Sequence, residues 1–82
     1  LMISKHSSLY LGSKKYSVLL SGHHTSISLE PLFWNELRVI CKKEKKSINQ
    51  IITEIDLARP SNHKKNLSSE VRIFILKYLQ PD

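Results

Sequence analysis

A change of hydrophobic period at Pro31 constrains the fold of this chain more than any other feature. From Thr25 to Leu29, apolar and polar residues alternate, which is the pattern of a half-buried strand. After Pro31, a residue that favours the first position of a helix, apolar residues recur at helical spacing. A short strand cannot bury one face alone, so helices or another strand must pack against it.

Three amphipathic helices are predicted after this strand. The first spans residues 31–44, and its apolar stripe consists of Phe33, Trp34, Leu37, Ile40 and Cys41. The second spans residues 47–58, starts with Ser47 and Gln50 at capping-box spacing, and has Ile48, Ile51, Ile52, Ile55 and Ala58 on one face. The third spans residues 68–79, with Ser68 or Ser69 as its expected N-cap; its apolar face holds Val71, Phe74, Ile75, Tyr78 and Leu79. Ile73 and Leu76 lie off that face, so this helix must be covered on more than one side.

A hairpin is predicted before the first helix. Residues 15–20 form a β-type run and residues 24–29 the alternating strand. The turn signal lies between them, over Ser21, Gly22, His23 and His24. Residues 1–13 are polar and irregular, which predicts a flexible arm, and residues 14–82 then form one domain.

Composition restricts how so small a domain can be stable and what it binds. The 82 residues include one cysteine, Cys41, which excludes an internal disulfide and makes oligomerisation the simplest source of stability. Thirteen Lys and Arg against seven Asp and Glu give a net charge of +6, which favours an anionic partner such as nucleic acid or a membrane surface. No apolar run approaches the roughly 18 residues of a membrane span, and no signal peptide is evident, so we expect a cytoplasmic protein.

The motifs argue against an enzyme. The chain has no glycine-rich phosphate loop, no nucleophile motif and no paired acids. Cys41 lies on an apolar stripe and is expected in the core. His23 and His24 would point to opposite sides of a strand, and His6 and His63 have no metal-ligand spacing. We therefore expect no catalytic residue, no metal and no cofactor.

The order of strand, helix, short turn and Ser-capped helix resembles the ribbon-helix-helix family of bacterial DNA-binding proteins. The resemblance runs from about Tyr16 to Leu79, which is most of the chain. Its most specific stretch runs from Gly22-His23-His24-Thr25-Ser26 through Leu29-Glu30-Pro31 to Phe33-Trp34. Lys46-Ser47-Ile48-Asn49 and the isoleucines at 51, 52 and 55 complete it. One departure is Lys45, where the family usually has glycine; a left-handed conformation there would cost roughly 1 kcal/mol. The fold class implied is mainly α with a short β ribbon: a ribbon-helix-helix homodimer with an N-terminal hairpin extension and an extra C-terminal helix.

The resemblance implies a sequence-specific transcriptional regulator that binds double-stranded DNA at the nucleoid. An antiparallel ribbon, with one strand from each of two chains, would enter the major groove. The expected base contacts come from His24, Ser26 and Ser28, opposite the core-facing Thr25, Ile27 and Leu29. The expected phosphate contacts come from the start of the second helix and from nearby lysines: Ser47, Ile48, Asn49, Lys45, Lys46, Lys14 and Lys15. The expected dimer core is Ile27, Leu29, Trp34, Leu37, Cys41, Ile48, Ile51, Ile52 and Ile55.

The alternative is an antitoxin or another protein-interaction module. In that interpretation the third helix would bind a toxin or another protein partner, while the ribbon still binds DNA. Binding to a membrane surface is less favoured, because the lysines do not share the polar face of one long amphipathic helix.

Overall fold

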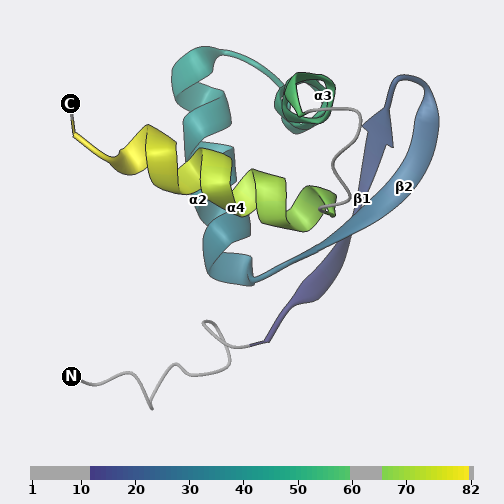
Figure 1. Ribbon diagram of the computed structural model, residues 1–82, viewed down its shortest axis with the longest axis horizontal. Coiled ribbons are helices and arrows are strands. Elements are labelled where there is room, and N and C mark those ends of the chain that lie inside the picture. Colours follow the sequence, from purple (N-terminus) through teal and green to yellow (C-terminus); the bar gives the residue numbers. More distant parts are fainter. Residues whose placement is uncertain (1–11, 60–65, 82) are drawn as a thin grey trace.

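A two-stranded hairpin is followed by three helices that pack against one of its faces (Figure 1). The structure is a computed structural model that describes residues 12–59 and 66–81. Its elements are β1 (Lys14–Leu20), β2 (His23–Leu29), α2 (Pro31–Glu44), α3 (Ile48–Ala58) and α4 (Leu67–Leu79). The predicted fold class is confirmed at the level of a β ribbon followed by helices. Most of the predicted arm, residues 1–11, lies outside the described residues.

The hairpin has a two-residue turn. Ser21 and Gly22 both have positive φ angles, 49° and 83°, which is the geometry of a type I′ turn. The twist of that turn matches the twist of the strands, so β1 and β2 pair along their whole length, from Leu20 opposite His23 to Lys14 opposite Leu29. The turn is shorter than the sequence predicted, since His23 and His24 belong to β2.

Helix α2 begins at Pro31 and ends at a left-handed residue, Lys45, with φ 58° and ψ 43°. The amide of Lys45 donates to the carbonyl of Lys42 at 3.3 Å, and the amide of Lys46 donates to the carbonyl of Cys41 at 3.0 Å. This is the Schellman pattern, which satisfies carbonyls that the helix end leaves unpaired. A lysine thus adopts the conformation for which the family favours glycine.

Helix α3 begins at the predicted cap. The Ser47 hydroxyl accepts a hydrogen bond from the Gln50 amide at 3.0 Å. The helix ends at Ala58, and Arg59 is extended, as expected of a residue that precedes a proline.

Helix α4 begins one residue earlier than predicted, at Leu67, and its cap is Asn66 rather than Ser68 or Ser69. The Asn66 side-chain oxygen accepts from the Ser69 amide at 2.9 Å. The predicted cap was wrong because asparagine caps at least as well as serine and precedes both serines. The Ser68 hydroxyl has another role, since it accepts from the Ser28 amide of β2 at 3.2 Å.

The core is built within one chain, from all five elements. Its buried side chains are Val18, Ile27, Leu29, Leu37, Ile40, Cys41, Ile51, Ile52, Val71 and Ile75. Six of the nine residues expected in a dimer core are among them, and the other three, Trp34, Ile48 and Ile55, pack partly buried against it. Within the chain, β2 is paired by β1, as the predicted hairpin required, and helices cover its core side.

Helix α4 covers α2, α3 and β2 with one face only. Val71 and Ile75 are buried on that face, whereas Leu76 and Leu79 are 52% and 50% exposed. Within the described chain, α4 therefore presents apolar side chains to solvent, although the sequence suggested that it is covered on more than one side.

Candidate nucleic-acid interface

The hairpin face that points away from the helices is exposed and almost entirely polar. Strand alternation places His24, Ser26 and Ser28 of β2 on this face, together with Lys15, Ser17 and Leu19 of β1. Ser28 is half-buried and the other five are exposed. We refer to these six residues as the outer face of the ribbon.

The opposite face of the ribbon is the one that packs on the helices. Ile27 and Leu29 are 4% and 0% exposed, as expected for the core side of β2, and Val18 is 3% exposed on β1. Thr25 lies on the same side as Ile27 but is exposed, three residues after Gly22, the last residue of the turn. The predicted separation of the two faces of β2 is thus present in the structure, and what the outer face contacts remains a prediction.

Two contacts fix the ribbon to the helices at different points along its length. Near the turn, the Leu19 amide donates to the side-chain oxygen of Asn49 in α3 at 2.9 Å. Nearer the start of β1, the Tyr16 ring stacks on Trp34 of α2, with centroids 4.0 Å apart and planes within 5°. These contacts orient the outer face relative to the start of α3, where phosphate contacts were predicted.

The start of α3 has unpaired amides beside the ribbon. The Ser47 hydroxyl accepts from the Gln50 amide, and the Ser47 carbonyl accepts from the Ile51 amide. The amides of Gln50 and Ile51 are therefore paired. Among the described residues, the amides of Ile48 and Asn49 have no acceptor, which is normal for the first turn of a helix. The Asn49 side chain is already engaged with β1 through its oxygen, which leaves its amide nitrogen as the donor that could reach a phosphate.

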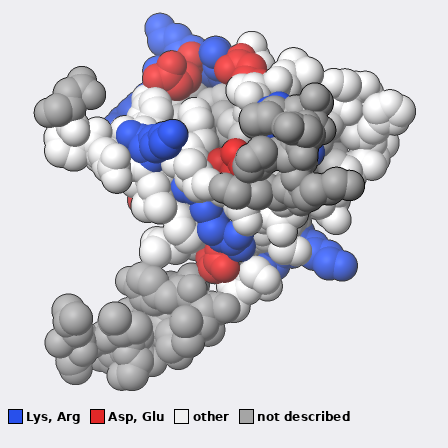
Figure 2. Space-filling model, in the orientation of Figure 1, with Lys and Arg blue, Asp and Glu red and all other residues white. Residues whose placement is uncertain are grey.

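The lysines predicted to contact phosphate differ in their surroundings. Lys14, Lys15 and Lys45 are exposed, whereas Lys46 forms an ion pair with Glu54 at 3.0 Å. On the face of the molecule seen in Figure 2, Lys and Arg side chains alternate with acidic ones and form no continuous basic patch. The lysines predicted to contact phosphate lie in two places: Lys14 and Lys15 at the start of β1, and Lys45 and Lys46 just before the cap of α3.

Polar contacts hold α4 against the rest of the fold. Arg72 and Glu30 form a two-pronged ion pair with distances of 2.8 and 3.2 Å, and the Arg72 guanidinium lowers the pKa of that carboxyl. The Tyr78 hydroxyl donates to Glu44 at 2.6 Å, which raises the pKa of Tyr78 because the bond and the nearby carboxylate favour the protonated phenol. Together with the bond from Ser28 to Ser68, these contacts link α4 to both ends of α2 and to β2.

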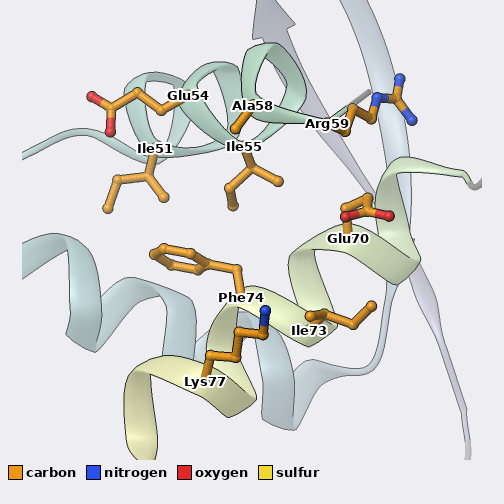
Figure 3. A pocket seen from close by; sticks show the side chains of 9 residues that line it. All are labelled: Ile51, Glu54, Ile55, Ala58, Arg59, Glu70, Ile73, Phe74 and Lys77. Carbon is orange, nitrogen blue, oxygen red and sulfur yellow. The ribbon is translucent and has the colours of Figure 1, made fainter. Parts of the chain in front are cut away.

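A pocket of about 330 Å³ lies between α3 and α4 (Figure 3). Ile51, Ile55 and Phe74 point into the gap between the two helices. Charged side chains, including Glu54, Glu70 and Lys77, stand at its rim. The pocket lies next to α4, the helix that the alternative interpretation assigns to a protein partner.

The described residues hold no cluster of metal ligands, and the cysteine among them is buried. Among the described residues, no group of three or more His, Cys, Asp or Glu comes together to hold a metal ion. Cys41 is buried, and burial raises the pKa of its thiol, so the thiol stays protonated as a core side chain should. In the described part of the chain, no helix combines the length and apolar character of a membrane span.

Residues of β1 were the main omission of the sequence interpretation. Lys15 was assigned to phosphate, but Ser17 and Leu19 were assigned to nothing. The signal was present, because Lys15, Ser17 and Leu19 alternate with Tyr16, Val18 and Leu20. A two-residue turn at Ser21 and Gly22 fixes the register of a hairpin, so extending it to β1 would have placed all three on the outer face.

Comparison with known proteins places the chain in one family. Residues 13–79 match the family model of the ribbon-helix-helix domain, which covers the hairpin and all three helices. Searches among curated proteins and among solved structures found no match.

Proposed function

The chain belongs to the ribbon-helix-helix family, and on that premise we propose that it is a sequence-specific DNA-binding protein that regulates transcription. Domains of this family generally bind DNA and dimerise, and they are typically not enzymes. The observation that carries the proposal is the outer face of the ribbon: a rigidly held polar surface on the side opposite the core. The major groove, about 12 Å wide, admits a two-stranded ribbon of this kind.

His24, Ser26 and Ser28 are the proposed base contacts on β2. Their side chains can donate to or accept from base edges in the groove, and none of them is part of the core. Ser28 also has its amide bonded to Ser68, which fixes the end of the strand nearest α2. A base-reading surface on a rigid element loses little conformational entropy on binding.

The proposed phosphate contacts flank the ribbon. At its turn end lies the start of α3, where Ser47, Ile48 and Asn49 present amides and the helix dipole is positive. At its other end lie Lys14 and Lys15. Lys45 and Lys46 precede α3, and Lys46 would have to share its charge between Glu54 and a phosphate.

We also propose that the protein acts on DNA as a homodimer. A ribbon formed between two chains, as the resemblance implied, would need the outer edge of β2, because β1 occupies the other edge. The backbone groups of His24, Ser26 and Ser28 point to that outer edge, and pairing along it would replace the bond from Ser28 to Ser68. A Ser26→Cys variant tests this arrangement: under mild oxidation it should form a disulfide-linked dimer, which a Ser17→Cys variant should not.

The alternative function, an antitoxin or protein-interaction module, rests on α4. Leu76 and Leu79 are exposed, and the pocket between α3 and α4 is lined by apolar side chains. One observation speaks against this alternative: α4 is folded and hydrogen-bonded to α2 and β2 within one chain, unlike a segment that folds only on binding a partner. The alternative requires a partner whose binding is lost in a Leu76→Ala, Leu79→Ala variant that still binds DNA.

Selection from a random duplex library tests the proposal directly. The wild-type protein should enrich a defined sequence, and its affinity for that sequence should exceed its affinity for random DNA. His24→Ala, Ser26→Ala, Ser28→Ala should lose this preference while its thermal melt stays cooperative, because each base contact is worth on the order of 1–3 kcal/mol. Asn35→Ala, an exposed change on α2, is the control. Absence of any enriched sequence would refute sequence-specific binding.

A further inference from the structure

One side of α4 faces solvent and carries apolar residues at a regular spacing. Val71 and Ile75 turn the opposite side into the core. On the solvent side, Ser69, Ile73 and Leu76 follow one another at intervals of four and three residues, the spacing of the seam along which two helices pack in a coiled coil. Leu76 is 52% exposed, and Ile73 is half-buried at the edge of the pocket between α3 and α4. We refer to Ser69, Ile73 and Leu76 as the α4 seam.

Two charges of opposite sign flank the α4 seam on the side of the pocket. Glu70 and Lys77 are both at the rim of the pocket (Figure 3). They are seven residues apart, so they lie on the same side of the helix, about 10.5 Å apart along its axis. Among the described residues, neither side chain has a hydrogen bond or an ion pair. The helix dipole favours an acid near the start of a helix and a base near its end, but it does not require both on one side.

We propose that the α4 seam is a contact between two copies of this chain, in which the two α4 helices pack antiparallel across a two-fold axis. In that arrangement the same flank of each helix meets, so Glu70 of one chain lies beside Lys77 of the other, and symmetry forms the reverse pair. Ile73 of one chain then packs against Leu76 of the other. A parallel pair would instead bring Arg72 of one helix beside Lys77 of the other, and these like charges repel. The charges of α4 therefore complement a second copy of α4 in one orientation.

This contact does not rest on DNA binding, and it uses a different element from the β2 pairing proposed above. The side of α4 that touches β2 does so through Ser68, whereas the α4 seam lies on the solvent side. One chain can therefore make both contacts, and two β2 dimers joined through α4 would have a mass of 4 × 9.5 kDa = 38 kDa. The α4 seam offers little apolar surface, so we expect it to associate more weakly than the β2 dimer.

Sedimentation of the full chain at low salt, at concentrations that extend well above micromolar, measures this association. The mass of the wild-type protein should rise with concentration beyond that of the β2 dimer. Glu70→Lys and Lys77→Glu each replace both ion pairs by like-charge pairs, and each should weaken the association on the order of tenfold, since a surface pair contributes a few-fold in either direction. The double variant Glu70→Lys, Lys77→Glu exchanges the signs within both pairs and should recover the association.

A mixture of the two single variants gives a sharper result. Each variant alone repels its own copies, but the Glu70→Lys chain complements the Lys77→Glu chain, so the equimolar mixture should associate as the wild-type protein does. Recovery cannot come from a more stable helix, because each reversal is unfavourable to the helix dipole and the double variant carries both. Arg38→Glu is the control: it reverses an exposed charge on α2, changes the net charge as Lys77→Glu does, and should leave the association unchanged.

The proposal is overturned if the single reversals associate as the wild-type protein does, or if neither the double variant nor the mixture recovers the association. A wild-type mass that never rises beyond that of the β2 dimer overturns it as well. Leu76→Gln removes the apolar contact without changing charge and should also weaken the association; because Leu76 is half exposed, this variant tests the α4 seam even if a charge reversal prevents folding. If Ser26→Cys forms no linked dimer, the β2 pairing fails, but the effect of the charge reversals on α4 still decides this inference.

Discussion

At Lys45, the backbone conformation favours glycine, whereas the proposed phosphate contact requires the lysine side chain. Its φ angle of 58° is one that a residue with a Cβ adopts at a cost, and the Schellman end of α2 requires it. Its exposed ammonium group lies two residues before the cap of α3, where phosphate contacts are proposed. A glycine would fit the backbone better but would remove a positive charge from the proposed interface.

Lys45→Gly should therefore stabilise the fold by about 1 kcal/mol. In a domain of this size, that difference raises the melting temperature by about 4–8 °C. Lys43→Gly is the matched control, since it removes the same charge within the last turn of α2 and should destabilise by a little under 1 kcal/mol. Thermal melts by circular dichroism measure both. Equal effects of the two substitutions would show that charge, not the left-handed conformation, decides the stability at residue 45.

Among the elements, α4 is held by an ion pair, Arg72 with Glu30, whose strength we expect to depend on pH. The Arg72 guanidinium lowers the pKa of Glu30 below its ordinary value in the folded chain. A carboxyl with a lowered folded-state pKa adds stability above its unfolded-state pKa, and that stability is lost as the pH falls through the folded value. The stability that the ion pair of Glu30 with Arg72 gives to α4 should thus begin to fall below about pH 4.3, the ordinary pKa of glutamate.

Unfolding by urea at pH 7 and at pH 3 measures this contribution. The wild-type protein should lose more stability between the two pH values than Glu30→Gln, which has no carboxyl to titrate. Arg72→Met should also reduce the loss of stability between the two pH values. The double variant should show no further reduction, because both substitutions remove the same ion pair. An acid sensitivity of Glu30→Gln equal to that of the wild-type protein would place the titrating group elsewhere.

The elements themselves were predictable because their signals are local. The period-2 run ending at Leu29, Pro31 at a helix start and Ser47 as a cap each act within a few residues. The cap of α4 was missed because Asn66 and Ser68, both good N-cap residues, stand close together. In the structure Asn66 caps the helix, and Ser68 instead bonds to Ser28, 40 residues away. Contacts such as Glu30 with Arg72, 42 residues apart, leave no periodic trace in the sequence.

At the scale of the whole molecule, the hairpin and the three helices were predictable, but most contacts between them were not. Strand β1 pairs with the strand at Thr25–Leu29, as the predicted hairpin required, and α4 packs on α2 and α3. Which face of β2 is buried could be predicted from alternation alone. That β1 adds Ser17 and Leu19 to the other face depends on the hairpin register, which is a long-range consequence of the turn.

The side chains buried within one chain predict how the homodimer behaves on dilution. At micromolar concentration, sedimentation should give about twice the chain mass of 9.5 kDa, which is 19 kDa. On further dilution the mass should halve while the helical circular dichroism signal is retained, because the ten side chains buried among the described residues already pack together within one chain. Loss of helix together with dissociation would mean that folding requires the second chain. A monomer at every concentration would exclude the dimer.

Salt dependence reports how much of the binding is electrostatic. Two chains carry 2 × (+6) = +12. Each phosphate that a lysine neutralises releases counterions. The logarithm of the affinity should therefore fall linearly with the logarithm of the salt concentration, with a slope of about −0.9 per neutralised phosphate.

Lys45→Gln should flatten this slope and weaken binding to selected and random DNA alike. Lys46→Gln should flatten it less, because Lys46 already shares its charge with Glu54. Ser47→Ala removes a cap worth about 1 kcal/mol without changing charge, so it should lower the melting temperature and leave the slope unchanged. Titrations at several salt concentrations separate these cases. Wild-type binding that does not depend on salt would show that the lysines do not neutralise phosphates, and a protein partner would then explain the basic surface better than DNA.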